Sequence, residues 1–378
     1  MISYALFHFS NGWVSVEDTA HSQHQKSVIL SLESYTFGAF TVMNAMLNVG
    51  LFAGVLLIGT FGNLLIIVTI TRNTTFHRAP FFFLLNLSIS DLCRSLFCIP
   101  FVIASIVQDV GWIHGEVSCI AIAFTNFFFV FNSFISLMVI AIDRYISVAY
   151  PYWHKRWLQG PTSLTLVAVG WMLSALVSLP PVFSDGSYTF VEEENQCTFK
   201  YTSYKHNDTF GFLLVLTAVQ FGSIFIYARI FIFLRDHRRM KPVETPAATS
   251  SNWTFTGLGL GNVFPNAWTG LPLRPIPTIT QNLSSGNGYI GPVSGRRNEH
   301  LTRLFFAVTL CVYCLWSFYS VQYFLLIFTD TVIPKSVRRF TTLATFLQVC
   351  VSPVTFTFHY RKLFLNNLVH FHLRREFR

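Results

Sequence analysis

An acidic residue and a basic residue lie side by side at the end of an apolar run in this chain. In MVIAIDRYISVAY, Asp143 and Arg144 are adjacent and Tyr145 follows them. A carboxylate and a guanidinium can form a charge-assisted pair that holds the arginine until a competing partner arrives. The alternative interpretation is an ordinary charge pair at a membrane interface. The pattern therefore predicts either a lock on Arg144 or a simple interfacial ion pair.

A second pair of ionisable residues lies inside an apolar run. Asp91 and Arg94 occur in LSISDLCRSLF, and such a residue costs about 2.5–3.5 kcal/mol to insert into a membrane, which makes it a functional candidate. Three residues separate the two on nearly the same helix face. We expect a buried salt bridge between them. The alternative is that Arg94 directs an unpaired donor into a pocket for an acidic group of a ligand.

Two of the seven cysteines are placed for a disulfide. Cys119 lies 25 residues before Arg144, which in a helix is about 37 Å, roughly one membrane thickness. Cys197, in EEENQCTF, is the only other cysteine that we place outside the hydrocarbon layer on the oxidising side. A Cys119–Cys197 bond is therefore expected to stabilise the fold by about 2–4 kcal/mol, and two free thiols are the alternative. No residue pattern predicts a metal site or a catalytic site.

The elements that must position these residues are membrane helices. The chain has 378 residues, of which 52% are hydrophobic and 11% are charged, whereas soluble domains have about 25% charged residues. Seven stretches reach the roughly 20 apolar residues that span a bilayer. They are Val49–Thr71, Pro80–Val107, Glu116–Ala149, Ser163–Phe183, Thr209–Leu234, Leu301–Phe328 and Ser336–Phe358. We predict an all-α membrane protein, a bundle of seven transmembrane helices in a lipid bilayer.

The positions of Lys and Arg predict the orientation of the bundle. Their bias puts the N-terminus outside the cell and the C-terminus in the cytoplasm. Residues 1–48 are then an extracellular tail, residues 49–358 the seven-helix body, and residues 359–378 a short amphipathic helix and tail on the inner leaflet. Residues from about 236 to 298, rich in Pro, Gly, Ser and Thr, are expected to be a disordered inner loop.

The basic residues do not indicate nucleic-acid binding, although the net charge is +9. They lie in the gaps between apolar runs and form no nucleic-acid motif. Lys335, Arg338 and Arg339 are exceptions to the orientation rule, because they fall in the last outer loop. Asn207, in the sequence Asn-Asp-Thr of an outer loop, is a predicted glycosylation site.

Together these features resemble the rhodopsin-like (class A) G-protein-coupled receptors. Asp143-Arg144-Tyr145 resembles their DRY motif, and the pair Gly62-Asn63, Asp91 and Trp171 fit the first, second and fourth helices. A narrower resemblance is carried by HRAPFFFLLNLSISDLCRSLFCIPFV, YTFVEEENQCTF, NDTFGFLL and RRMKPVETPAATSSNWTF. These segments resemble the super-conserved receptors expressed in brain (the SREB family), which are orphan receptors. The resemblance implies a plasma-membrane receptor that transmits an unknown extracellular or intramembrane stimulus to a heterotrimeric G protein, without catalysis.

The resemblance also implies roles for single residues. Arg144 would be held by Asp143 at rest and would meet the G protein when the sixth helix moves, with Tyr227 moving in beside it. Glu299 is a candidate second partner of Arg144 in the resting state. An aromatic pocket for an unknown ligand would be formed by Arg94, Asn126, Trp316, Tyr319 and Gln348.

The resemblance further implies a sodium site in the membrane core. Asp91 would anchor the ion, in a polar core with Asn63, Ser133, Ser352 and Pro353. The alternative is a protonated Asp91 that is hydrogen-bonded to Asn63 and Ser352. No other cofactor is expected.

Three departures from the class A pattern favour a second hypothesis. Phe318, in CLWSFY, replaces the proline that kinks the sixth helix, so this hinge should be stiffer. Ser352–Phe356 read SPVTF instead of NPxxY, and Val219 replaces the proline of the fifth helix. The second hypothesis is a non-signalling or constitutively biased seven-helix protein that uses its long inner loop as a scaffold. A transporter is disfavoured, because the spans show no inverted repeat.

The same pocket positions exclude two ligand types. Asn126 stands where amine receptors carry an aspartate, so a protonated amine has no acidic partner there. Phe346 stands where opsins carry the lysine that binds retinal covalently.

Overall fold

The computed structural model describes the backbone of residues 16–108, 111–158, 160–183, 187–200, 208–239, 292–329 and 331–376. It describes the side chains of residues 42–74, 76–108, 111–158, 160–183, 187–200, 210–237, 299–329 and 331–359. The predicted glycosylation site Asn207 and residues 240–291 of the predicted inner loop lie outside these ranges.

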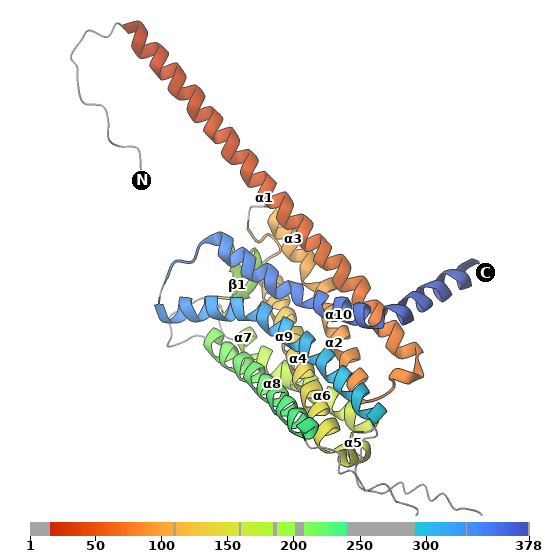
Figure 1. Ribbon diagram of the computed structural model, residues 1–378. Helices are drawn as coiled ribbons and strands as arrows, with labels where there is room; N and C mark the ends of the chain where they lie inside the picture. Colours follow the sequence, from red (N-terminus) through yellow and green to blue (C-terminus); the bar gives the residue numbers. More distant parts are fainter. Residues whose placement is uncertain are drawn as a thin grey trace, which may run out of the picture.

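Helices make up nearly all of the described chain (Figure 1). In chain order the elements are α1 (Val16–Arg72), the 3-10 turn η1 (Thr74–Phe76), α2 (Ala79–Phe97), α3 (Ile99–Gln108), α4 (Glu116–Ala149), α5 (Pro151–Trp157), α6 (Gly160–Ser178), α7 (Pro180–Phe183), β1 (Tyr188–Val191), β2 (Gln196–Phe199), α8 (Asp208–Arg239), α9 (Pro292–Thr329) and α10 (Lys335–Glu376).

Within the described residues, seven helical stretches are long and apolar enough to span a membrane, which confirms the predicted seven-helix fold. They are Val42–Arg72, Ala79–Gln108, Glu116–Ala149, Gly160–Phe183, Phe210–His237, Glu299–Thr329 and Lys335–His359. The first stretch includes the whole predicted span Val49–Thr71. Helix α1 itself begins at Val16, inside the segment predicted as a tail, and Figure 1 shows it extending well beyond the bundle.

Two of the predicted spans are divided by a break in the helix, and a proline explains each break. The second span breaks at Cys98, two residues before Pro100, and the fourth breaks at Leu179, next to Pro180. A proline has no N–H to donate and its ring clashes with the carbonyl four residues earlier. Helix α9, in contrast, runs without a break through Phe318.

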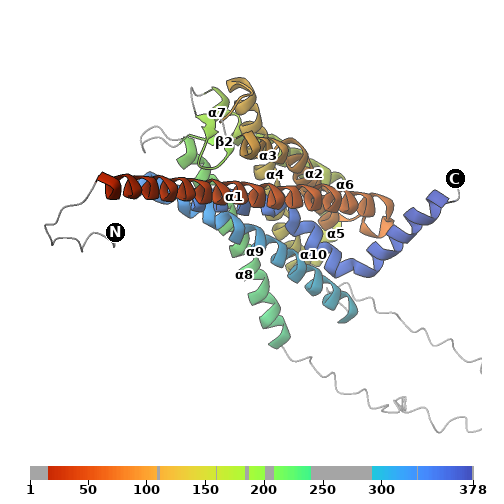
Figure 2. The same cartoon turned by 90° about the horizontal axis from the view of Figure 1, so that it is seen from above.

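The predicted inner loop and C-terminal helix have different bounds in the structure. Helix α8 continues to Arg239 and α9 begins at Pro292, so both edges of the range 236–298 are helical rather than disordered. The predicted C-terminal helix is present, because residues 359–376 are helical and continue α10. Figures 1 and 2 show α10 changing direction before its C-terminal turns.

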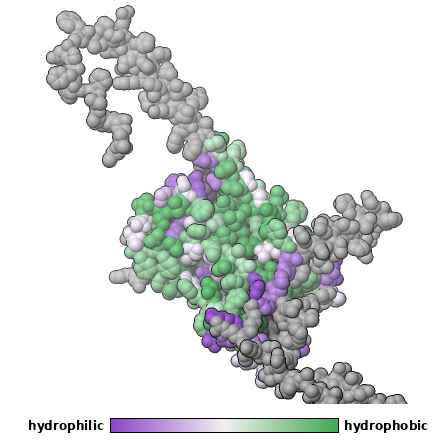
Figure 3. Space-filling view, in the orientation of Figure 1, coloured by the Kyte–Doolittle hydropathy of each residue, from purple (hydrophilic) through white to green (hydrophobic). Residues whose placement is uncertain are grey.

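Helix α4 forms the centre of the bundle and packs against α2, α6, α8 and α9, while α1 packs against α2 and α10 (Figures 1 and 2). Its inward face supplies Phe127, Phe131 and Phe134 to the main hydrophobic core. The outer surface is largely apolar in Figure 3, which suits contact with lipid. Hydrophobic side chains thus fill the core between the helices and also cover the outer surface of the bundle, as in a membrane protein.

A short β-hairpin, not predicted from the sequence, joins α7 to the next helix. Strands β1 and β2 pair antiparallel, with Tyr188 opposite Phe199 and Val191 opposite Gln196. The turn between them is Glu192–Asn195, and Asn195 has a φ of 51°, a left-handed conformation that Asn tolerates better than most residues. We call the end of the bundle that carries this hairpin the hairpin end, and the opposite end the Arg144 end.

Candidate functional site

The predicted disulfide joins the hairpin to the central helix. Cys119, in the first turns of α4, is bonded to Cys197 on β2. Arg144 lies near the other end of the same unbroken helix. The structure therefore confirms that one helix carries the disulfide at the hairpin end and the Asp143–Arg144 pair at the opposite end.

The Asp143–Arg144 pair is buried at its end of the bundle. Arg144 Nε donates to Asp143 Oδ2 at 2.9 Å, and the two side chains are 3% and 0% exposed. His154 on α5 lies with its Nε2 at 2.9 Å from Asp143 Oδ1. One carboxylate thus holds both cationic side chains when His154 is protonated. Sequence analysis missed His154, because only the fold of α5 brings it back to α4.

Tyr227 and Tyr145 belong to one hydrophobic cluster at the Arg144 end. Tyr227 is fully buried on α8 and packs with Ala141 and Val148, which flank Arg144 on α4, and Tyr145 packs against this cluster. The ring of Phe306 on α9 lies 5.2 Å from that of Tyr227. The structure therefore brings Tyr227 next to the helix segment that carries Arg144, with α9 alongside.

Glu299 does not have its predicted role in this structure. Arg303, one turn further along α9, donates to its carboxylate at 2.6 Å, and no ion pair joins Glu299 to Arg144 within the described side chains. Residues four apart lie next to each other on one face of a helix. Glu299 therefore reaches Arg303 more easily than it reaches Arg144 across the bundle. The pair on Arg144 is therefore made by Asp143 and not by Glu299.

Asp91 lies in a polar core, with partners that differ from the predicted ones. Ser133 Oγ donates to Asp91 Oδ1 at 3.0 Å, and Gln348 Nε2 donates to the same oxygen at 3.3 Å. Asn63 instead donates to the carbonyls of Gly59 and Val349. The predicted hydrogen bonds from Asp91 to Asn63 and Ser352 are therefore absent among the described residues.

Three buried oxygen atoms in this core have no hydrogen-bond partner within the described side chains. They are Asp91 Oδ2, Asn63 Oδ1 and Ser352 Oγ. Buried polar atoms normally find a partner, and carboxylate, amide and hydroxyl oxygens are the donors that hard cations prefer. The residues present therefore fit a small cation. Close packing supports this core, because Pro353 on α10 lies directly against Gly62 on α1.

The predicted salt bridge between Asp91 and Arg94 is wrong. Arg94 Nε donates to Asn126 Oδ1 at 2.8 Å, and Nη1 donates to the Thr345 carbonyl at 2.8 Å and to Gln348 Oε1 at 3.3 Å. Gln348 contacts both charges, so its amide separates them. The Arg94 side chain is directed toward α4 and α10, which carry these acceptor oxygens. Its planar guanidinium donates to several of them at once and does not pair with Asp91 on its own helix.

Four of the five predicted pocket residues come together around Gln348. Trp316 Nε1 donates to Gln348 Oε1 at 2.6 Å, and Arg94 and its partner Asn126 lie on the other side of this amide. Tyr319 is turned toward the hairpin, where its hydroxyl lies 3.1 Å from Thr198 Oγ1. Sequence reasoning found these residues, but missed Thr345 and the hairpin contacts.

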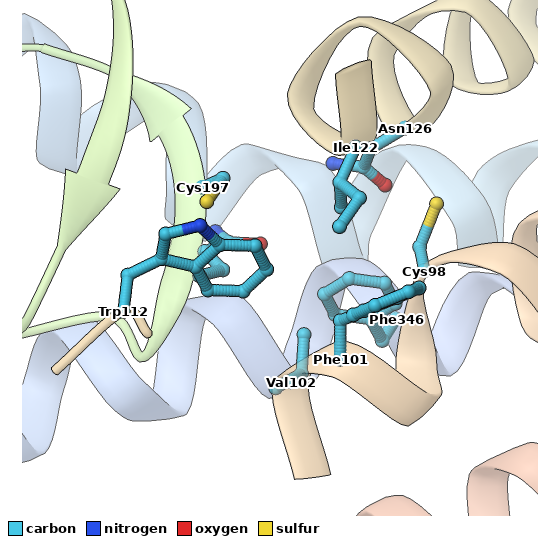
Figure 4. Close-up of a pocket in the computed structure, with 9 residues that line it drawn as sticks. Cys98, Phe101, Val102, Trp112, Ile122, Asn126, Cys197 and Phe346 are labelled. Carbon is cyan, nitrogen blue, oxygen red and sulfur yellow. The ribbon is translucent and has the colours of Figure 1, made fainter. Parts of the chain in front are cut away.

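A small pocket opens beside this cluster at the hairpin end (Figure 4). Aromatic and sulfur-containing side chains dominate its wall, which consists of Cys98, Phe101, Val102, Trp112, Ile122, Asn126, Gln196, Cys197 and Phe346. Figure 4 shows these residues coming from the hairpin, from α4, from the neighbouring helices and, for Trp112, from the segment between α3 and α4. The pocket is therefore apolar, with the amide of Asn126 on one side.

The hairpin turn inserts a carboxylate into the bundle. Glu194 is 1% exposed. Gln196 donates to its Oε2 at 3.0 Å, and Tyr323 and Gln322 donate to its Oε1 at 3.0 and 3.2 Å. Burial raises the pKa of Glu194 above its ordinary value, and the hydrogen bond from Gln196 and the charge of Arg338 oppose this shift only in part. The buried Glu194 carboxylate thus fixes the turn to α9, although its burial is opposed by the loss of its hydration.

Ion pairs join the same turn to the start of α10. Lys335 Nζ lies 3.0 Å from Glu192, and Arg338 lies 3.6 Å from both Glu193 and Glu194. Ser105 at the end of α3 also donates to the Asn195 carbonyl at 2.6 Å. Lys335 and Arg338, which broke the charge rule in the sequence, therefore have acidic partners on the hairpin.

A seven-helix bundle whose central helix carries a disulfide at one end and a buried Asp-Arg pair at the other is typical of one class of membrane receptors. Comparison with known proteins gives the same class. The 7 transmembrane receptor (rhodopsin family) pattern matches residues 62–356. The chain therefore belongs to the rhodopsin family of G-protein-coupled receptors, which are receptors and not enzymes.

The nearer relatives identify the branch of this family. The chain is 34% identical over 307 residues to Probable G-protein coupled receptor 173 of Danio rerio, covering 79% of each chain. It is 32% identical over 318 residues to Probable G protein-coupled receptor 85 of Danio rerio, covering 81% of this chain and 85% of the relative. It is 28% identical over 309 residues to Probable G-protein coupled receptor 27 of Rattus norvegicus, covering 78% and 80%. All three are SREB receptors, which confirms the narrower resemblance.

Proposed function

We propose that this receptor works in the plasma membrane with its hairpin end outside and its Arg144 end facing a heterotrimeric G protein in the cytosol. The orientation is supported by the Lys and Arg bias between the spans and by the disulfide at the hairpin end, since disulfides persist on the oxidising side. By the same orientation Asn207 is exposed to the glycosylation machinery.

The observation that carries the proposal is the buried Asp143–Arg144 pair beside Tyr227. Arg144 is held in the resting state, and a movement of α9 away from α4 removes Phe306 from the side of Tyr227. Arg144 then exchanges Asp143 for the G protein, with Tyr227 beside it. This is a two-state switch whose balance a ligand can shift from the hairpin end.

The polar core is the proposed site of a sodium ion. Asp91, Asn63 and Ser352 offer the three oxygens described above as lacking partners, and Ser133 fixes the other oxygen of Asp91. A bound cation would supply charge compensation for Asp91 in the resting bundle.

A G-protein activation panel in cells tests the proposed function. The unliganded receptor and Arg144→Ala are compared at equal surface expression against each G-protein class. We expect at least one class to be activated above the level of untransfected cells, and this activity to be lost in Arg144→Ala. Equal readings for both proteins in every class would contradict the proposal.

One observation favours the second candidate, a non-signalling scaffold. Helix α9 is continuous where class A receptors have a proline, and Phe318 points outward with 49% of its surface exposed. If the stiff helix prevents signalling, the panel reads zero for every class while the receptor still reaches the surface.

A further inference from the structure

Helix α5 is a short surface helix that joins the ends of two consecutive spans. Its sequence is PYWHKRW, and it lies between the span that ends at Ala149 and the one that begins at Gly160. Figure 1 shows it at the Arg144 end, next to α4 and α6. Because both ends of this short connection are fixed to membrane spans, α5 must lie at the boundary between the bilayer and water.

The two faces of α5 have different surroundings. On the inner face, His154 contacts Asp143, and Leu158, directly after the helix, packs against the main hydrophobic core. Arg156 follows His154 by two residues, which places it about 200° further around the helix axis. Trp153, three residues before Arg156, lies on the same outer face. The helix thus turns His154 toward the bundle and an arginine with an aromatic neighbour away from it.

The outer face is rich in exposed aromatic rings. Tyr152, Trp153 and Trp157 are 66%, 54% and 59% exposed, and the rings of Trp153 and Trp157 are stacked with their centroids 6.3 Å apart. A cluster of exposed apolar side chains marks a contact surface. Tyr and Trp are enriched where a protein crosses the membrane–water boundary, because their rings fit at the depth of the lipid headgroups. The place of α5 between two spans therefore favours lipid as the partner of this face.

The charge of this segment favours an anionic lipid. Lys155 and Arg156 are both exposed, and the sequence contains no acidic residue between Arg144 and Asp185. A guanidinium binds the oxygens of a phosphate group through two parallel hydrogen bonds. The cytosolic leaflet of cell membranes carries the anionic lipids and attracts basic residues next to a span. In the orientation proposed above, α5 faces this leaflet.

We propose that the outer face of α5 docks on anionic phospholipid of the cytosolic leaflet, with the aromatic rings among the headgroups and Arg156 on the phosphate. The choice of leaflet rests on the proposed orientation, whereas docking itself requires no G protein. Docking on the outer face holds α5 in place, and with it His154 on the inner face beside Asp143. The lipid surface thereby supports the buried pair that restrains Arg144.

The test measures tryptophan fluorescence of the purified full-length receptor in phosphatidylcholine nanodiscs. A small fraction of the lipid is replaced by phosphatidylserine or phosphatidylcholine brominated on its acyl chains, since bromine quenches tryptophan on contact. We expect brominated phosphatidylserine to reach half-maximal quenching at a lower fraction than brominated phosphatidylcholine does. Arg156→Gln should reduce this preference about five-fold, which is the contribution of one basic residue near an anionic surface.

Two further proteins show where the signal originates. A receptor with Trp153→Phe and Trp157→Phe should lose the part of the quenching that favours phosphatidylserine. Arg303→Gln removes an exposed arginine from α9 at the same end of the bundle, and it should keep the wild-type preference. Equal quenching of the wild type by both lipids, a preference that Arg156→Gln retains in full, or a preference that remains without the two tryptophans would overturn the proposal.

Two additions to the same samples distinguish lipid from other partners. Excess glycerophosphoserine, the headgroup without acyl chains, should leave the quenching unchanged; competition would assign the face to a free phosphate compound and overturn docking on a bilayer. A missing lipid preference, together with protection of the α5 tryptophans from aqueous acrylamide by added G protein, would assign the face to the G protein. Because the lipid measurements contain no G protein, their outcome is independent of whether the receptor activates one.

Discussion

Single carboxylates set the behaviour of both ends of this receptor. At the Arg144 end, Asp143 contacts Arg144 and His154 together, so its loss removes a partner from the arginine and from α5 at once. At the hairpin end, Glu194 is buried among three hydrogen-bond donors. The first residue was predicted from its neighbour in the sequence. The second was not, because a run of three glutamates in a loop normally indicates a solvated surface.

Removal of the Asp143 charge should activate the receptor. In Asp143→Asn the restraint on Arg144 is weakened, and a loss of about 1.4 kcal/mol shifts a two-state equilibrium by about ten-fold. Basal nucleotide exchange on the G protein should therefore rise by up to about ten-fold, measured at matched surface expression. Glu116→Gln removes the same charge from the exposed start of α4 and should have no effect. An unchanged or lower basal rate in Asp143→Asn would contradict the lock.

Glu194 should make receptor stability depend on pH. Because its pKa is raised from an ordinary value of 4.5, the folded receptor holds the proton more tightly than the unfolded chain does. The stabilisation from this proton is present below about pH 4.5 and is lost as the pH rises through the raised pKa. Tyr323, Arg338 and Glu193 face the same carboxyl group and set the size of the shift.

The measurement is the Tm of purified receptor between pH 5 and pH 8. We expect the fall of Tm with rising pH to be shallower in Glu194→Gln than in the wild type. Glu192→Gln, an exposed neighbour in the same turn, should keep the wild-type slope. The same slope in all three proteins would show that Glu194 is not the titrating group.

At the scale of helices, packing between α1 and α10 supports the polar core. A Cβ atom on Gly62 would lie 2.5 Å from Pro353 Cβ, and one on Gly59 would lie 2.7 Å from Val349. The two helices therefore approach each other closely only because these positions have no side chain. Asn63, which follows Gly62 on α1, donates to the Val349 carbonyl on α10 and so also joins the two helices.

Gly62→Ala should push the two helices apart. Overpacking of this kind costs about 1–3 kcal/mol, so the Tm of the purified receptor should fall. Gly54→Ala, on the same helix with nothing within 4 Å of the added Cβ, should leave Tm unchanged or raise it slightly, since alanine favours the helix. Equal Tm values for the two variants would contradict the close approach.

Sequence reasoning gave the helices correctly because a bilayer requires long apolar runs. It placed Cys119 and the Asp143–Arg144 pair at opposite ends of one helix, since helix rise fixes distances along one element. It chose Cys197 as the partner of Cys119 because disulfides form on the oxidising side. It failed where partners come from other elements. Arg94 was paired with Asp91 by spacing alone, but the fold offers it Asn126 and Thr345 from two other helices.

At the scale of the whole molecule, the hairpin end and the Arg144 end are joined by one unbroken helix. Helix α4 carries the disulfide at one end and the Asp143–Arg144 pair at the other, and α9 contacts both the hairpin through Tyr323 and Tyr227 through Phe306. A change at the hairpin therefore has a direct route along α9 to the neighbourhood of Arg144. Signalling by this route requires α9 to have two positions at the Arg144 end.

The most direct test of that claim is the distance between spin labels at Arg303 on α9 and Tyr152 on α5, both exposed. The receptor is placed in nanodiscs, with Cys311 and Cys314 replaced by Ser, and a nucleotide-free G protein from the class that responds in cells is added. We predict that the distance distribution shifts to longer values, and that Arg144→Ala reduces the shift. Coinciding distributions with and without bound G protein would contradict the account.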